Sequence, residues 1–129
     1  MTDKLKITKT DGNVTILHLE GDINKQTEGM LLSEAQAVLD SGKRWLVIDL
    51  KQVGILSSAG LHTLHSIYKM FTSSEDSQKW QAEHVGETFK SPSFKLAEPP
   101  PQVHYVLSIA GFLQNIYIFP SLQEALDSF

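Results

Sequence analysis

The stretch Leu46-Val-Ile-Asp-Leu50, followed by Val53-Gly-Ile-Leu-Ser-Ser-Ala-Gly-Leu61, decides the fold class of this 129-residue chain. Its first part is a nearly continuous apolar run, which predicts a strand buried on both faces inside a helix-covered sheet. Its second part places Ser57 and Ser58 just before apolar residues at helical spacing, at the N-terminus of a helix. Unpaired backbone N–H groups and the positive end of the helix dipole favour negative charge there. A serine at that position can be a helix cap, an anion site or a phosphorylation site.

Apolar patterns before and after this stretch predict alternating strands and helices. Two short strands at 5–9 and 14–19, joined by the turn Asp11-Gly12-Asn13, predict an opening hairpin. The remaining expected elements are a helix over 31–41, the strand at 45–50, a helix over 57–71, a strand at 94–97, a helix over 101–110, a strand at 115–119 and a helix from 120 onward. This order predicts an α/β fold in which about four helices cover a mixed, mostly parallel sheet of about five strands.

Residues 73–92 differ from the rest of the chain because they are polar and show no apolar period. They predict a long loop or a mobile insertion, with Trp80 and Phe89 as the side chains that attach it to the rest of the protein. Apart from this insertion, residues 1–129 are expected to form a single domain, because a chain of this length builds one core and is too short for two.

The composition excludes several classes of protein. The chain has no cysteine, a net charge of −4 and 41% hydrophobic residues. Without cysteine it has no disulfide, no thiolate metal site and no cysteine nucleophile, which fits a reducing compartment. Because there is no block of Lys and Arg, neither nucleic acid nor an anionic membrane is the expected partner. No apolar run reaches about 18 residues and no secretory signal pattern is present, so we expect a cytoplasmic protein without a membrane span.

Catalytic and metal-binding motifs are not recognisable in the sequence. His62 and His65 can share one helix face, but no third ligand stands at a suitable spacing, so no metal is expected. The residues around Ser58 lack the Gly-x-Ser-x-Gly turn of a nucleophilic serine, and no glycine motif cradles a phosphate. Asp49 is expected to be structural and Met30 to lie in the core. We therefore predict no cofactor and no enzymatic activity.

Several segments together, by their order and spacing, resemble the STAS domain, which occurs in sulphate transporters and anti-sigma factor antagonists. The resemblance is strongest to the stand-alone bacterial anti-sigma factor antagonists and covers nearly the whole chain apart from the insertion. The segments that carry it are Leu19-Glu-Gly-Asp-Ile-Asn24, Leu46-Val-Ile-Asp-Leu50, Ser57-Ser-Ala-Gly-Leu61, Ile109-Ala-Gly-Phe-Leu113 and Ile118-Phe-Pro-Ser-Leu-Gln-Glu-Ala-Leu126.

The resemblance implies regulation by partner switching. An unmodified protein of this type binds a serine kinase that also acts as an anti-sigma factor, and the sigma factor is thereby released. The kinase then phosphorylates its partner, the complex separates, and a serine phosphatase resets the cycle. The family pattern Asp-Ser-(Ser/Thr)-Gly-Leu places the acceptor at Ser58 and puts Ala59 at the second hydroxyl position. Ser57 and Asn24 stand where the family often has Asp.

The resemblance also implies a docking surface around the acceptor and leaves open a weak homodimer. The residues expected at this surface are Asn24, Thr27, Gly54, Ser57, Ala59 and His62. The alternative is a non-switching STAS subunit, a structural part of a transporter-associated or signalling-scaffold complex. Such a subunit would have a constitutive partner in place of a phosphorylation cycle.

Overall fold

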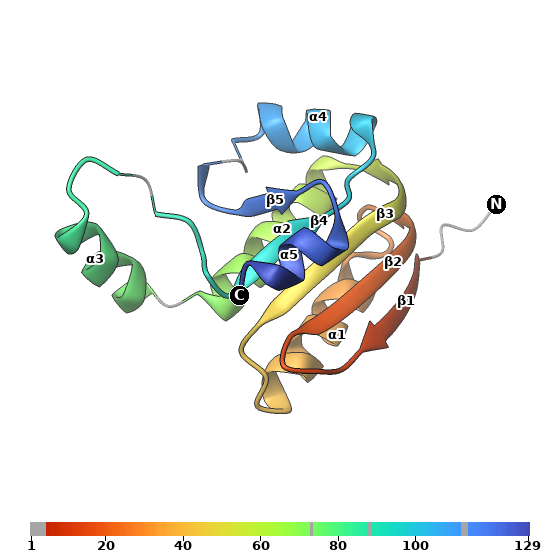
Figure 1. The fold of residues 1–129 in the computed structure, drawn as a ribbon. Coiled ribbons are helices and arrows are strands. Elements are labelled where there is room, and N and C mark those ends of the chain that lie inside the picture. The colour runs from red at the N-terminus through yellow and green to blue at the C-terminus, as the bar shows by residue number, and fades with distance from the viewer. Residues whose placement is uncertain (1–4, 73, 88, 112–113) are drawn as a thin grey trace.

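The computed structural model describes residues 5–72, 74–87, 89–111 and 114–129 and contains a five-stranded sheet with helices on both faces (Figure 1). In chain order the elements are β1 (Leu5–Thr10), β2 (Thr15–Ile23), α1 (Glu28–Asp40), β3 (Leu46–Leu56), α2 (Ser58–Phe71), α3 (Ser74–Glu83), β4 (Phe94–Ala97), α4 (Pro101–Ile109), β5 (Tyr117–Phe119) and α5 (Leu122–Asp127). Part of the predicted segment 109–113, namely residues 112 and 113, lies outside the described residues.

The strands lie side by side in the order β1-β2-β3-β4-β5. The hairpin pair β1 and β2 is antiparallel, and every later pair is parallel. The prediction of a mixed, mostly parallel sheet of five strands is therefore confirmed. The parallel arrangement brings the C-terminal ends of β2 and β3 to one edge of the sheet, since Ile23 pairs with Leu56.

The two faces of the sheet are covered unequally. The larger core lies between the sheet and α1, α2 and α4, and includes Leu31, Ile48, Leu64 and Leu107. The smaller core lies on the opposite face under α5, which contributes Ala125 against Val47 and its neighbours. Figure 1 shows α1 and α2 behind the sheet and α5 in front of it. Leu46 to Leu50 are buried throughout because β3 has a helical layer on each side at this level.

The strand β3 is longer than the sequence predicted, since it continues beyond Leu50 to Leu56. Its second half is only partly buried, with Val53 and Leu56 turned inward and the residues between them exposed. The extension pairs with the last residues of β2, after register shifts near Glu20 and Gly21. A continuous apolar run indicates a strand that is buried on both faces, so it does not reveal a half-exposed extension of this kind.

Residues 74–83 form the helix α3, so of the two alternatives predicted for 73–92, a long loop or an insertion, the loop without secondary structure was wrong. There are consequently five helices among the described residues, where about four were expected. No described side chain of α3 is buried, so the helix has no apolar stripe that a period search could find. The Trp80 ring makes an edge contact with Phe89 of the same segment, at 5.7 Å between ring centroids. Phe89 is the residue that joins the segment to the rest of the protein, since it is 4% exposed and its carbonyl accepts a hydrogen bond from Asn115 Nδ2.

Candidate functional site

The junction between β3 and α2 is held by Ser57, which caps the helix. The Ser57 hydroxyl accepts a hydrogen bond from the Gly60 N–H at 3.2 Å, as a serine N-cap is expected to do. The same hydroxyl and the Ser57 N–H both donate to the Ile23 carbonyl, at 3.2 and 3.1 Å. The first turn of α2 is therefore tied directly to the end of the neighbouring strand β2.

Gly60 allows the close approach of helix and strand at this junction. A Cβ atom at position 60 would lie 2.4 Å from the Ile23 carbonyl oxygen and 2.7 Å from Leu56 Cδ1. No side chain fits there without displacing the backbone of β2. The glycine in the motif Ser57-Ser-Ala-Gly60 is thus explained by packing alone.

Ser58 is the first residue of α2 and its side chain is exposed. Because Ser57 provides the cap, the Ser58 hydroxyl is not needed to satisfy the helix end. Within the described part of the chain, it makes no hydrogen bond. It is an accessible hydroxyl at the positive end of a 14-residue helix, the position at which an added negative charge is tolerated locally.

Several of the predicted contact residues lie around Ser58, but not all of them are accessible. His62 lies one helical turn further along α2 and is exposed, whereas Ala59 is partly buried. Gly54 is exposed near the end of β3, where its carbonyl accepts a hydrogen bond from the Gln102 side chain of α4 at 3.3 Å. Together, residues 54–62 and the first turn of α4 form one continuous part of the surface.

Thr27 does not belong to this exposed surface, so its prediction as a contact residue is corrected. Its side chain is only 3% exposed and donates to the Asp22 carbonyl at 2.8 Å. Asn24, which is half-buried, accepts hydrogen bonds from the N–H groups of Gln26 and Thr27 through its Oδ1 atom. Both side chains hold the turn between β2 and α1 in shape, which is the usual role of Asn and Thr at a helix entry.

Two apolar side chains are exposed that the sequence did not single out as exposed. Ile55 is 60% exposed and stands three residues before Ser58. Met30, which was expected in the core, is 50% exposed near the start of α1, so that expectation was wrong. The periodicity of α1 could have indicated this, because the buried residues Leu31, Ala35 and Val38 define a stripe that leaves position 30 outside.

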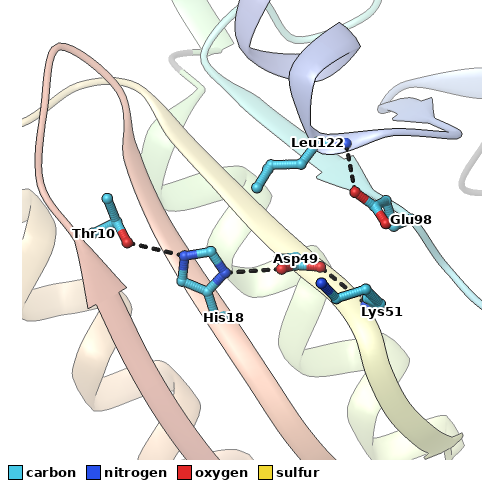
Figure 2. Close-up of polar contacts among 6 residues, drawn as sticks. All are labelled: Thr10, His18, Asp49, Lys51, Glu98 and Leu122. Carbon is cyan, nitrogen blue, oxygen red and sulfur yellow. Dashed lines mark hydrogen bonds and ion pairs between the residues drawn. The ribbon is translucent and has the colours of Figure 1, made fainter.

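A second polar cluster runs across the first three strands (Figure 2). The His18 ring contacts Thr10 Oγ1 through Nε2 at 3.0 Å and Asp49 Oδ2 through Nδ1 at 2.8 Å. The other carboxylate oxygen of Asp49 accepts the Lys51 N–H at 3.0 Å. Although the order hydroxyl, imidazole, carboxylate occurs in hydrolases, here each group comes from a neighbouring strand and Asp49 is only 5% exposed. The cluster ties the strands together, which agrees with the structural role predicted for Asp49.

The two histidines of α2 have different surroundings. His65 stacks on Tyr68, with 5.8 Å between the ring centroids. Burial lowers the pKa of His65, and the nearby charges of Lys69 and His62 lower it further. His62 stands on the Ser58 side of the helix.

In the part of the chain that the structure describes, no group of three or more His, Cys, Asp or Glu side chains is placed to hold a metal ion.

The fold and the site define a small α/β domain that presents a serine hydroxyl at a helix N-terminus beside an exposed apolar residue. The STAS domain family model matches residues 6–75. The chain belongs to the STAS domain family, as the resemblance predicted.

Several similar proteins carry the name anti-sigma factor antagonist. A protein of Bordetella bronchiseptica that carries the provisional name anti-sigma factor antagonist BtrV is 31% identical over 126 residues, which are 98% of this chain and 94% of that protein. An anti-sigma factor antagonist from Mycobacterium paratuberculosis has a crystal structure with a TM-score of 0.79 and 22% identity, covering 99% of this chain and 96% of that one. SpoIIAA of Bacillus in its phosphorylated form has a TM-score of 0.60 and 11% identity, covering 96% and 97%. At such identities, the two structural similarities establish the fold.

Proposed function

We propose that this protein is an anti-sigma factor antagonist that works by partner switching. In its unmodified form it binds an anti-sigma factor that is also a serine kinase, and phosphorylation of Ser58 releases it. A serine phosphatase restores the binding form. The observation that carries the proposal is the division of work between two adjacent serines: Ser57 caps α2, and Ser58 exposes a hydroxyl that the fold does not use.

The physical basis of the switch is the different effect of one phosphate on the fold and on an interface. A phosphate on Ser58 adds roughly −1.5 to −2 charges at neutral pH. At the N-terminus of α2 this charge is favourable by about 0.3–1 kcal/mol. In a complex that covers Ser58, the same charge loses its water, and a poorly paired buried charge costs several kcal/mol.

The comparisons support a switch that leaves the fold intact. SpoIIAA, an anti-sigma factor antagonist, has been solved in an unphosphorylated and a phosphorylated form, and both have the fold of this chain. The relative BtrV, which spans nearly the whole chain, carries the name of an anti-sigma factor antagonist.

The docking surface in this proposal consists of Gly54, Ile55, Ser58, Ala59 and His62, with Ser57 and Asn24 holding its shape from below. Small residues at 54 and 59 let a partner approach the helix end closely, and Ile55 supplies exposed apolar area. The backbone at Ile55 is held because its N–H donates to the Asp22 carboxylate at 3.1 Å. An exposed apolar side chain beside the modifiable hydroxyl suits an interface in which both are covered together.

The protein acts in this proposal as a binding partner in the cytoplasm and catalyses no reaction itself. Of the helices in the described residues, none has the length and apolar character needed to cross a membrane. The acidic net charge of −4 makes a protein surface a better partner than nucleic acid.

The test is a binding titration of purified Ser58 variants against candidate anti-sigma serine kinases from the same genome. Ser58→Ala should bind like the unmodified protein, and Ser58→Glu should bind at least about 100-fold more weakly, which corresponds to about 2.8 kcal/mol. Ser33→Glu is the matched control, because Ser33 is exposed in the middle of α1. Intact-mass spectrometry with ATP should show one added phosphoryl group in the wild type and none in Ser58→Ala.

Equal binding by Ser58→Ala and Ser58→Glu would contradict the proposal. A partner that stays bound to both variants, in fixed stoichiometry and without phosphoryl transfer, would instead support the non-switching STAS subunit.

A further inference from the structure

A cavity of about 820 Å³ lies at the end of the sheet opposite to Ser58. It is formed where the segment after α3 returns beside the start of β4 and β5 and the end of α5, a region that Figure 1 shows next to the C-terminus. Its volume falls within the range of about 300–1,000 Å³ that small-molecule sites usually have. The proposed switch at Ser58 uses no part of it.

Lys95 is the most unusual residue of this cavity, because it is a buried cation. It lies on β4 and is only 3% exposed. Its Nζ atom donates to the Ser128 hydroxyl at 2.8 Å and to the Ser128 carbonyl at 3.0 Å, both of which are uncharged acceptors. Within 4.0 Å, no carboxylate oxygen of the described ranges pairs with this Nζ atom. Lys95 therefore has no carboxylate partner among these residues, although a buried ammonium group normally requires one.

Aromatic rings from two parts of the chain form walls of the cavity. In the first wall Trp80 and Phe89 make an edge contact, and in the second, on β5, Tyr117 and Phe119 stack with 6.0 Å between their ring centroids. The Lys95 Nζ atom lies over the Phe129 ring at 4.1 Å from its centroid, and it is 5.3 Å from the centroid of Tyr117 and 5.9 Å from that of Phe119. A flat ring placed between these walls would find aromatic surface on both sides and a cation at the edge.

The charges around the cavity favour an anion. Lys90 adds a second cation whose Nζ atom lies 5.2 Å from the Tyr117 ring, and Glu87 is the single carboxylate in the lining. The charged lining residues are thus two cations and one anion. We propose that this cavity is a binding site for a small planar aromatic anion, whose negative group pairs with Lys95 and whose ring lies between the two aromatic walls.

The behaviour of the lysine in the empty cavity agrees with this assignment. Burial lowers the pKa of Lys95, because the ammonium group has lost water without gaining a counter-charge. A bound anion supplies that counter-charge and favours the protonated form. Affinity for the anion should therefore fall as the pH rises toward 10.5, the ordinary lysine value, and binding in that range should take up protons.

The test compares two dyes with the same ring system, anilinonaphthalene sulfonate and the uncharged phenylnaphthylamine. The protein should bind one sulfonate dye per chain, with an affinity roughly 10- to 100-fold higher than for the uncharged dye, as a charge-assisted contact would give. Trp45→Phe leaves Trp80 as the single tryptophan, and its fluorescence should transfer to the bound dye.

Lys95→Met keeps the length of the side chain and removes the charge, so it should abolish the preference for the sulfonate dye. Lys90→Gln, at a partly exposed position that cannot endanger folding, should reduce it by up to about fivefold. Lys9→Gln, an exposed position on β1, is the matched control and should change nothing. Near-ultraviolet circular dichroism confirms that each variant is folded.

Equal affinity for the two dyes in the wild type would overturn the proposal. So would an unchanged preference in both Lys95→Met and Lys90→Gln, or the absence of energy transfer from Trp80. None of these results bears on Ser58, so the site and the switch can fail separately.

Discussion

The junction of β3 with α2 and the helix α3 lie at opposite ends of α2 and are held in different ways. The helix α2 buries five residues, Gly60, Thr63, Leu64, Ile67 and Phe71, and its first turn is bonded to β2. No described residue of α3 belongs to either core cluster, and its Trp80 ring contacts His84 and Phe89, which lie in the same segment of the chain. After the helix, this segment is bonded to the rest of the protein where Asn115 Nδ2 donates to the Phe89 carbonyl at 2.9 Å. The junction is thus held by hydrogen bonds between two core elements, whereas the rings of α3 pack within their own segment.

The largest effect is expected from Gly60→Ala, which would break the junction. The new Cβ atom would collide with the Ile23 carbonyl and Leu56, so we expect the free energy of unfolding to fall by roughly 3 kcal/mol or more, at the upper end of overpacking effects. Urea unfolding followed by circular dichroism measures this change.

Gly29→Ala is the matched control for that substitution. Gly29 also lies in the first turn of a helix, α1, but a Cβ atom there would meet nothing within 4 Å. It should stabilise the protein by about 0.5–1 kcal/mol through helix propensity. Equal losses of stability in the two glycine variants would show that the close approach of α2 to β2 is not the reason why position 60 needs glycine.

The next largest loss of stability is expected from His18→Ala, which leaves the buried Asp49 carboxylate with the Lys51 N–H as its remaining partner. We expect a loss of roughly 1–3 kcal/mol, the usual cost of an unmet hydrogen bond to a charged group. His104→Ala, on an exposed face of α4, should stay within about 0.5 kcal/mol of the wild type. Similar losses in the free energy of unfolding for the two histidine variants would show that the contact between His18 and Asp49 has no special structural role.

The two serines of the junction should differ by a smaller amount. Ser57→Ala removes the helix cap and should cost about 1 kcal/mol, whereas Ser58→Ala should cost less than about 0.5 kcal/mol. Thermal unfolding of both variants under one set of conditions sharpens the comparison. A larger loss for Ser58→Ala would show that its hydroxyl serves the fold, and the division of work between the serines would be lost.

The smallest effect on global stability is expected in α3. Trp80→Ala removes the contacts with His84 and Phe89, but should change the free energy of unfolding by less than about 1 kcal/mol, because these rings lie outside both cores. Hydrogen exchange should instead show faster exchange of the amides in 74–83, with no change in α2. A loss of protection in both helices would mean that α3 and the core unfold together.

The difference between the β3–α2 junction and the helix α3 also explains which features could be predicted from the sequence. Buried periodicity predicted α1, α2 and the first half of β3, and small residues with hydroxyls predicted the helix start at Ser57. The length of β3, the exposure of Ile55 and the helix at 74–83 could not be predicted, because half-exposed or fully exposed residues carry no apolar period. The exposure of Met30 could have been predicted, since position 30 lies outside the buried stripe of α1. The burial of Thr27 was missed for a related reason: its hydroxyl is satisfied by the Asp22 carbonyl, a contact that no sequence spacing reveals.

Nor could the sequence reveal the cavity around Lys95. Its walls come from four separate parts of the chain, and a lysine inside a short apolar strand resembles an ordinary edge residue. The unusual feature is the lack of a carboxylate near its ammonium group in the described residues, which only the assembled structure displays.

Glu98, which directly follows β4, connects several elements of the fold. It has a φ of 54°, its N–H donates to the Phe119 carbonyl, and its carboxylate accepts the first N–H of α5 at Leu122, as Figure 2 shows. Three prolines follow it and lead straight into α4, where Gln102 holds the Gly54 carbonyl. Glu98 thus joins the start of α5, whose C-cap Ser128 meets Lys95, to the prolines that lead into α4, whose Gln102 binds the Gly54 carbonyl. The surroundings of Lys95 and the surface at Gly54 are therefore connected along one path of contacts that passes through Glu98.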